Sequence, residues 1–150
     1  QEWAASLKCF ERAMELEPIN VEYHMLLGGI LKKIGMHDEA ALIFANALRL
    51  EPQNLEVYLE AAANLQAAEC HEDALEMLQE VPEASQSDPL VVARTFISLY
   101  STGRHQSAFL LLDTALRSTP DLCATVAELF PEVQQDATFA RCVLNTKTAQ

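Results

Sequence analysis

Residues 35–52, GMHDEAALIFANALRLEP, contain a turn, one amphipathic helix and a stop signal. Asp38 can accept hydrogen bonds from the free N–H groups of a first helical turn, so we expect it to be an N-cap. Ala40 and Phe44 fall on one helical face. Pro52 cannot continue a helix, because it lacks the N–H group. The stretch therefore predicts one helix with a single apolar face.

The elements of this stretch recur along the chain at intervals of 34 or 68 residues. A fixed period of this length is the signature of a repeat architecture. The recurring residues are Pro18, Pro52 and Pro120; Gly35 and Gly103; Phe10 and Phe44; Ala13, Ala47 and Ala115; and Ala40, Ala74 and Ala108.

The composition predicts an all-α fold. Of the 150 residues, 50% are hydrophobic, which is enough to build a core, and only 4 Gly and 6 Pro interrupt the chain. Alternating β-branched runs are missing, and good helix formers dominate. We therefore expect helices with little or no sheet.

The chain is strongly acidic. Its formal net charge is -12, and between Leu50 and Ala93 there are ten Asp or Glu residues and no Lys or Arg. Such a chain repels phosphate backbones and acidic membrane surfaces, so we expect neither nucleic acid nor a membrane as a partner. No apolar run approaches the roughly 20 residues that span a bilayer. The charge suits either a solvated helix surface or a surface that attracts a basic partner.

The four cysteines, Cys9, Cys70, Cys123 and Cys142, are 61, 53 and 19 residues apart. This spacing favours free thiols in a reducing compartment over a disulfide framework. We therefore expect a cytoplasmic protein. The first residue is Gln1 and not Met, so the removal of a signal sequence stays an open alternative.

The unit Val21–Asn54 resembles the tetratricopeptide repeat, a 34-residue pair of antiparallel helices, A and B. The resemblance rests on His24 at the aromatic position of helix A, on the pair Leu27-Gly28 and on the turn residue Gly35. It implies a right-handed α-solenoid of antiparallel helix pairs, formed by residues 1–150 as a single array. The expected divisions are a half-repeat helix B at 1–20, repeats at 21–54, 55–88 and 89–122, and C-terminal capping helices at 123–150.

The later units depart from this pattern. The second unit has Ala61-Ala62 in place of Leu-Gly, and Glu69 in place of the turn glycine. It also places Val81-Pro82 where its second helix should end, so we expect that helix to stop early. The third unit has Thr95-Phe96 in place of Leu-Gly, and we expect its helices to pack further apart.

The N-terminal segment has an incomplete repeat. Residues 2–17 match a helix B whose helix A is missing, so its apolar face needs a cover. We expect either an upstream continuation of the parent protein or another molecule to supply it. The face for self-association or for the missing helix consists of Trp3, Leu7, Phe10 and Met14.

The C-terminal segment departs from the repeat after residue 122. We expect Asp121 to cap a short helix that runs through Phe130. Pro131 should either end that helix or start a new one. The last apolar stripe, from Val133 to Leu144, suits the atypical capping element that a repeat array needs.

The sequence predicts no catalytic residues, no metal site and no cofactor, so we expect no enzyme. His37, His71 and His105 follow one another at 34 residues and share one turn position, so the repeat explains them. Successive repeats would place them roughly 10 Å apart, too far to share a metal. Cys70 and His71 are adjacent, which is a poor geometry for two ligands on one ion.

The family resemblance implies a concave groove, lined by the A helices, that holds a peptide or a helix of a partner protein. Apolar, small and acidic residues share the predicted face. This mixture suits an extended segment with apolar side chains or an amphipathic helix with basic flanks. The predicted groove residues are Glu22, Met25, Gly29, Lys33, Glu56, Leu59, Ala63, Gln66, Ala93, Arg94, Ile97 and Tyr100.

Three functions fit these features. The first is a non-catalytic adaptor that binds a peptide in the groove. The second is a holding chaperone similar to the small acidic tetratricopeptide chaperones of type III secretion systems, which this chain resembles in size, charge and groove character. The third is a structural fragment of a larger scaffold that self-associates, so a homo-oligomer is one expected state.

Overall fold

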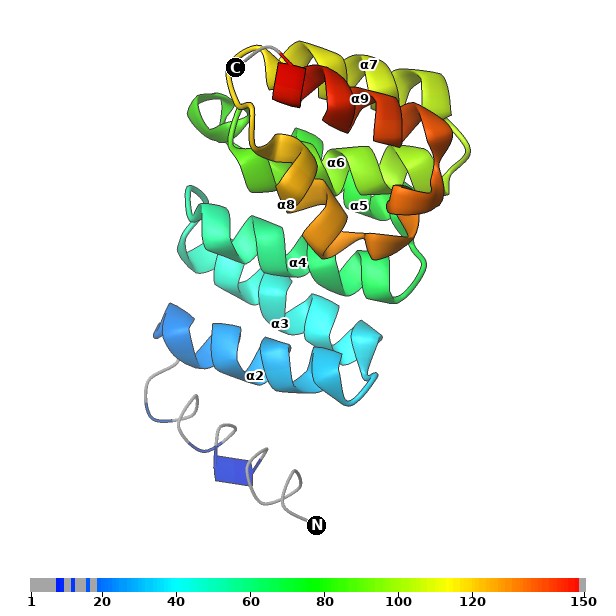
Figure 1. Ribbon diagram of the computed structural model, residues 1–150. Helices are drawn as coiled ribbons and strands as arrows, with labels where there is room; N and C mark the ends of the chain where they lie inside the picture. Colours follow the sequence, from blue (N-terminus) through cyan, green and yellow to red (C-terminus); the bar gives the residue numbers. More distant parts are fainter. Residues whose placement is uncertain (1–7, 10–11, 13–15, 17–18, 149–150) are drawn as a thin grey trace. The chain divides into compact units, whose positions relative to one another are not determined.

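The computed structural model describes residues 8, 9, 12, 16 and 19–148, which form α-helices and short 3-10 helices and no strand (Figure 1). The predicted all-α class is confirmed. The chain divides into two compact units, residues 1–82 (unit 1) and residues 83–150 (unit 2). In this described part, no helix combines the length and the apolar character needed to cross a bilayer.

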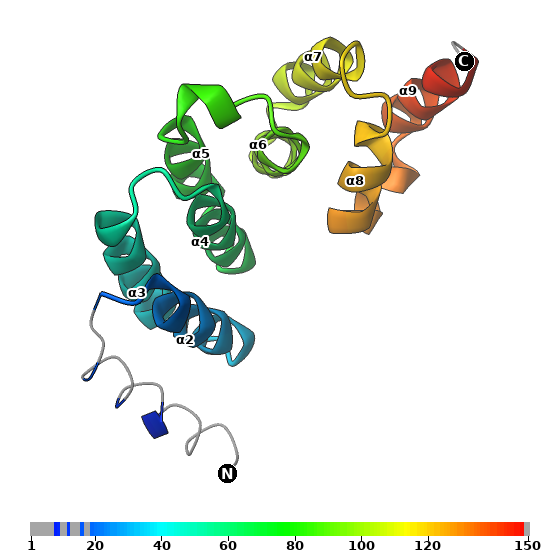
Figure 2. The same ribbon diagram turned by 90° about the vertical axis from the view of Figure 1, so that its left-hand side faces the viewer.

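In unit 1, each described α-helix packs against the next one in the chain, and the first and third are also in contact. Figure 2 shows the two pairs, α2 beside α3 and α4 beside α5. Short turns at 34–36 and 68–70 join the helices within each pair. The helices are α2 (Val21–Lys33), α3 (His37–Leu50), α4 (Leu55–Ala67) and α5 (His71–Gln79).

Unit 2 begins with a 3-10 helix and one regular pair, α6 and α7, joined by a turn at 102–104. The next helix, α8, contacts both members of that pair. A second 3-10 helix then leads to α9, which contacts α7. The elements are η1 (Glu83–Ser85), α6 (Pro89–Ser101), α7 (His105–Leu116), α8 (Leu122–Leu129), η2 (Pro131–Gln135) and α9 (Ala137–Thr148).

The N-caps of α2, α4 and α6 repeat with the period of the sequence. Asn20, Asn54 and Asp88 each accept a hydrogen bond from a backbone N–H of the first turn. The prediction that Asp38 caps its helix is wrong. The N-cap of α3 is Met36, with no side-chain hydrogen bond, and Asp38 lies inside the first turn. There its negative charge still favours the helix N-terminus through the helix dipole.

The turns within the three regular pairs have one geometry. The residue after each C-cap has a positive φ: 82° at Gly35, 60° at Glu69 and 79° at Gly103. In the first of these turns, Gly35 N–H donates to the carbonyl of Lys32, and Met36 N–H donates to that of Leu31. This is the Schellman motif, which normally uses glycine. Glu69 adopts the same left-handed conformation at a cost of about 1–2 kcal/mol.

The ends of α5 and α8 agree with the sequence predictions, whereas the predicted cap at the start of α8 does not. Helix α5 ends at Gln79, before Val81-Pro82, as predicted. Helix α8 ends at Leu129, and Pro131 starts η2, which decides between the two alternatives for that proline. Asp121 lies at the N-cap of α8, but its side chain makes no capping hydrogen bond, so this part of the prediction is wrong.

The core of unit 1 centres on a close approach between α2 and α3. The Phe44 side chain is only 1% exposed, and it packs against the backbone of Gly28. A Cβ atom on Gly28 would lie 2.7 Å from Cε1 of Phe44. The buried apolar cluster around this contact consists of Val21, Leu27, Leu31, Ala40, Phe44, Ala47, Val57 and Ala61.

Two polar contacts tie α4 to the preceding pair. The Asn64 side chain is 1% exposed; its Nδ2 donates to the carbonyl of His37 at 2.9 Å, and its Oδ1 accepts from His37 Nδ1 at 2.9 Å. Both hydrogen-bonding groups of the buried amide are therefore satisfied. Lys32 on α2 forms an ion pair with Glu60 on α4 at 2.5 Å.

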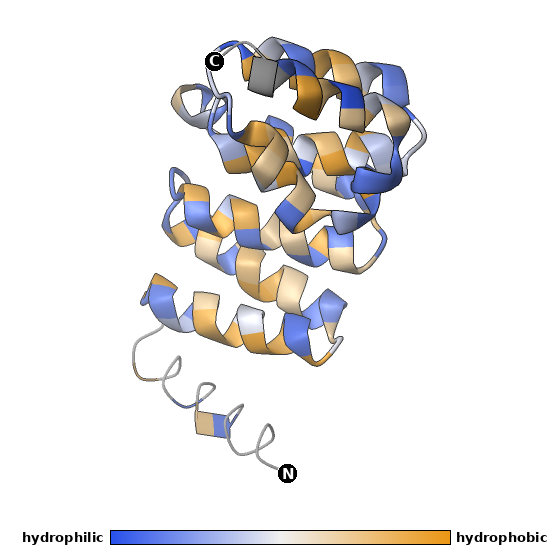
Figure 3. Cartoon of the chain, in the orientation of Figure 1, coloured by the Kyte–Doolittle hydropathy of each residue, from blue (hydrophilic) through white to orange (hydrophobic). Residues whose placement is uncertain are grey.

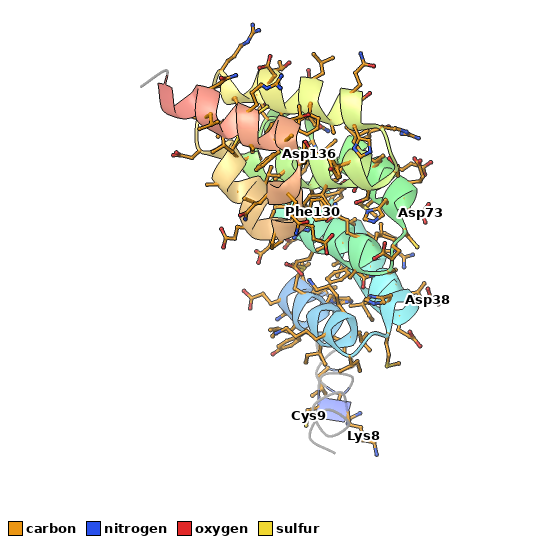
Figure 4. All side chains as sticks on the ribbon, turned by 45° about the vertical axis from the view of Figure 1, so that its right-hand side comes forward. Lys8, Cys9, Asp38, Asp73, Phe130 and Asp136 are labelled. Carbon is orange, nitrogen blue, oxygen red and sulfur yellow. The ribbon has the colours of Figure 1, made fainter. Side chains whose placement is uncertain are left out.

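Unit 2 is built around an aromatic cluster. Phe96 is fully buried, and its ring centroid lies 5.6 Å from that of Phe109 and 6.2 Å from that of Phe139 on α9. Tyr100 donates from its hydroxyl to Asp136 at 2.8 Å, and Asp136 accepts the N–H groups at the start of α9. Figure 4 labels Asp136, which directly precedes α9, and Phe130, which directly follows α8. One carboxylate thus joins α6 to the beginning of α9.

Gly28→Ala and Gly29→Ala should change stability in opposite directions. A Cβ at Gly29 meets nothing within 4 Å, so alanine should gain about 1 kcal/mol of helix propensity. A Cβ at Gly28 would clash with the buried Phe44 ring, and overpacking of about 1–3 kcal/mol should outweigh that gain. Urea unfolding of the two variants measures the difference. If both alanines stabilise equally, the close approach of α2 and α3 is not tight.

Tyr100→Phe should cost stability in a pH-dependent way. The hydrogen bond from Tyr100 lowers the pKa of Asp136, and the same bond raises the pKa of Tyr100. The Asp136 contribution is therefore present at neutral pH and lost as pH falls through its lowered folded pKa. At pH 7 we expect a loss of about 1–3 kcal/mol in Tyr100→Phe, because the bond involves a charged acceptor.

The matched control is Tyr58→Phe, since the Tyr58 hydroxyl donates to an uncharged acceptor, the carbonyl of Pro52, at 3.3 Å. Urea unfolding between neutral pH and about pH 3, below the ordinary Asp pKa, should show the cost of Tyr100→Phe shrinking. The cost of Tyr58→Phe should stay constant. Parallel pH curves for the two variants would contradict the charged Tyr100–Asp136 bond.

Candidate functional site

A depression of about 730 Å³ lies between the N-terminal ends of α2 and α4 in unit 1. Its walls are the start of α2 from Ile19 to the second helical turn, the first turn of α4, and the turn that leads into α4. The side chains of Asn20 and Asn54 hold the two helix starts as N-caps. The lining residues are Ile19, Asn20, Val21, Glu22, Met25, Leu26, Glu51, Asn54 and Glu56.

The depression is acidic. Its described lining includes the exposed residues Glu22, Glu51 and Glu56 and, within the part of the chain that the structure describes, no Lys or Arg. Glu51 accepts a hydrogen bond from the Asn54 side chain at 2.6 Å, which fixes one carboxylate at the rim. The site can therefore attract a cationic group.

Apolar side chains share the depression with these carboxylates. Ile19 is 79% exposed and Leu26 is 53% exposed, which are large fractions for residues of this size. Met25 lies half-buried beside them. An exposed apolar group of this kind next to charges is typical of a contact surface.

The structure brings three of the predicted groove residues together in the depression: Glu22, Met25 and Glu56. The other predicted residues of unit 1 lie further along the same two helices, outside the lining. Lys33 is exposed, and the half-buried ones are Gly29, Leu59, Ala63 and Gln66.

The predicted groove residues of unit 2 have different surroundings. Ala93 and Ile97 are buried in the unit 2 core, 0% and 6% exposed, so they fill space between helices and offer no surface to a partner. Arg94 is half-buried. Tyr100 is also half-buried, and its hydroxyl is bonded to Asp136.

The predicted self-association face lies in the N-terminal segment. Trp3, Leu7, Phe10 and Met14 lie outside the residues that the structure describes. That prediction stays as the sequence states it.

Sequence reasoning missed six lining residues: Ile19, Asn20, Val21, Leu26, Glu51 and Asn54. Two signals could have found three of them. Positions 22 and 26 are four residues apart on α2, which places Leu26 on the side of Glu22. Asn54 lies one period after Asn20, so the repeat itself marks both caps.

Three of the four histidines start helices. His37, His71 and His105 are the first residues of α3, α5 and α7. His24 is 4% exposed, and its Nδ1 donates to the carbonyl of Asn20 at 2.9 Å. Among the described residues, no group of three or more His, Cys, Asp or Glu is arranged to hold a metal ion.

The two C-terminal thiols are poor nucleophiles. Burial, and to a lesser degree the charge of the Cys142 thiolate, raises the pKa of Cys123 to about 11. Burial also raises the pKa of Cys142. Both groups are therefore protonated at neutral pH, and a thiol in this state neither attacks an electrophile nor binds a soft metal readily.

Comparison with solved structures shows the same fold in other proteins. The chain aligns with MamA at 14% identity and a TM-score of 0.72, over 98% of this chain and 90% of that chain. For MamA 41-end from Desulfovibrio magneticus RS-1, the identity is 16% and the TM-score 0.72, over 99% and 87%. For YrrB, a tetratricopeptide repeat protein with an unusual peptide-binding site, the identity is 18% and the TM-score 0.67, over 99% and 78%. Identities this low establish the fold alone.

Comparison of sequences adds the family. No protein with a curated description matches the chain significantly. Residues 33–93 match the family model described as the tetratricopeptide repeat. This match agrees with the 34-residue period, the repeated N-caps and the repeated turns, so residues 33–93 are similar to the tetratricopeptide repeat and the rest of the chain shares its fold.

Proposed function

We propose that this chain is a non-catalytic protein–protein interaction module whose α2–α4 depression binds a peptide segment with a basic residue beside apolar ones. Proteins of this family generally act as interaction scaffolds without catalytic activity of their own. One observation supports the proposal above all. Three exposed carboxylates and exposed apolar side chains line the same depression.

The charge distribution supports a basic partner. Unit 1 contains fifteen Asp or Glu and five Lys or Arg, so its field attracts cations over the distance of a Debye length, about 8–10 Å in physiological salt. Glu22, Glu51 and Glu56 give this field a local focus. A Lys or Arg of the partner would gain ion pairs there, and no Lys or Arg among the described lining residues would compete with it.

The apolar part of the depression supports affinity. Covering a side chain such as Ile19 or Leu26 contributes about 1.5–3 kcal/mol each when the burial is complete. Met25 has a flexible thioether chain that adapts to differently shaped partners. Two such contacts and one ion pair suit a partner with a short motif better than one with a large flat surface.

The face beyond the depression leaves room for a partner backbone. A Cβ added to Gly29 meets no atom of the described residues within 4 Å, so the described part of the chain leaves α2 open at this position. Either an extended segment or an amphipathic helix could continue along it. The fold that the chain shares with YrrB, which is described as having a peptide-binding site, is compatible with this role.

Glu22→Lys combined with Glu56→Lys should abolish selection of basic peptides. Wild-type protein, offered a displayed random peptide library, should enrich Lys or Arg next to Leu, Ile, Phe or Met. A synthetic peptide from that selection should bind more weakly as salt rises from about 50 mM to about 500 mM, because exposed ion pairs are screened. Fluorescence anisotropy measures both effects.

The matched control is Asp38→Lys combined with Asp73→Lys. These acids are exposed, lie in first helical turns like Glu22 and Glu56, and do not line the depression. Figure 4 labels both on the outer surface of α3 and α5. The control has the same net charge as the test variant and should keep peptide binding. Equal losses in the two variants would mean that only net charge matters, and would contradict a site at α2–α4.

A further inference from the structure

Helices α8 and α9 are arranged differently from the regular pairs. In the pairs α2–α3, α4–α5 and α6–α7 the two helices pack along each other. In the described part of the chain, α9 contacts η2 and α7, and no comparable contact joins it to α8. The η2 segment that starts at Pro131 separates the two helices in sequence and allows them to spread.

The spread leaves an apolar groove of about 670 Å³ between α8 and α9. Its floor includes Cys123 and Phe139, which are 5% and 1% exposed. Ala124, Ala127 and Ala140 line it with small side chains, and Leu144 lines it while remaining 64% exposed. Figure 3 shows the visible face of α8 mostly in the hydrophobic colours.

Elsewhere in this protein, a third helix packs against two neighbouring helices. Within unit 1, α4 contacts both α2 and α3. Within unit 2, α8 contacts both α6 and α7. Each filling helix buries apolar residues at helical spacing, such as Val57 and Ala61 on α4 and Leu122 and Val126 on α8. A groove between two helices of this fold is thus complementary to a third helix with one apolar face.

The charge of the groove restricts which charges its occupant can carry. Among the lining residues that the structure describes, Asp121 is the one that carries a charge, and it is exposed. Its side chain does not cap α8, and none of the hydrogen bonds or ion pairs found among the described residues uses its carboxylate. A cation on the occupant would meet a free partner there, whereas an acidic occupant would be repelled.

We propose that the α8–α9 groove binds an amphipathic helix of a partner protein, with apolar residues at i, i+4 and i+7 and a Lys or Arg that reaches Asp121. The alanines allow the helix axis to approach to about 8–10 Å, the spacing of packed helices. Large side chains of the occupant fill the space above Cys123 and Phe139. This surface is distinct from the α2–α4 depression and lies on other helices.

The probe is a fluorescein-labelled, side-chain-stapled model helix of about four turns, with leucines at i, i+4 and i+7 and one lysine at the end. Stapling is needed because short helices are marginal in water. The wild-type protein should bind it with micromolar affinity by anisotropy. A stapled helix of the same composition with its leucines scattered around the axis should bind at least about tenfold more weakly.

Two pairs of variants locate the binding. Ala124→Glu with Ala140→Glu places carboxylates in the apolar groove at exposed positions, and should weaken binding at least about tenfold. Ala137→Glu, exposed on α9 and outside the lining, should not. Asp121→Lys should weaken binding about fivefold, the size of one exposed ion pair, whereas Glu128→Lys on the same helix should not. Circular dichroism confirms that each variant keeps its helices.

Three outcomes would overturn the proposal. One is no binding of the amphipathic probe by a well-folded wild-type protein. Another is equal affinity for the scattered-leucine helix, which would show general apolar stickiness. The third is a wild-type dimer in light scattering that Ala124→Glu with Ala140→Glu converts to monomer, which would make a second copy the occupant. Binding that survives Glu22→Lys with Glu56→Lys separates this groove from the proposed peptide site.

Discussion

The contact between the Phe44 ring and the backbone of Gly28 sets the geometry of α2 and α3, and the equivalent position changes along the chain. One period later the pair is Ala62 and Leu78, and two periods later it is Phe96 and Leu112, all buried. In unit 2 the aromatic residue of the pair is therefore Phe96 on the first helix, α6, whereas in the first pair it is Phe44 on the second helix, α3. Phe96 extends beyond its own pair and contacts Phe139. The same register position that closes α2 on α3 thus recruits α9 in unit 2.

Periodicity made the repeated parts of this fold predictable from sequence. The all-α class, the early end of α5 and the shared position of the three histidines follow from hydrophobic spacing and from Gly and Pro alone. The cap of α3 did not follow, because Asp38 and the true N-cap, Met36, are two residues apart and both lie where a helix can start. Backbone dihedral angles decide between them, and a side-chain preference does not.

The candidate site was only partly predictable, for a geometric reason. On a helix, an inner-face position and a core position differ by one step, so Ala93 and Ile97 have the spacing of groove residues and are nevertheless buried. The α8–α9 groove had no sequence signal. It depends on how far η2 separates two helices, and the apolar stripe from Val133 to Leu144 is compatible with both a closed and an open pair. The two proposed surfaces also differ in chemistry, since the described lining residues include three carboxylates in the first and one in the second.

The bond between Asn64 and His37 has a consequence for cooperativity. Asn64 belongs to α4, yet it satisfies the backbone and the imidazole at the start of α3. If α4 detaches, the first turn of α3 loses a carbonyl partner, and the buried amide loses both of its own. Helices α3 and α4 are therefore coupled in local unfolding, although the sequence repeat groups α3 with α2. The cooperative units of unit 1 overlap across repeat boundaries, and amide exchange in α3 is governed as much by the helix after it as by the helix before it.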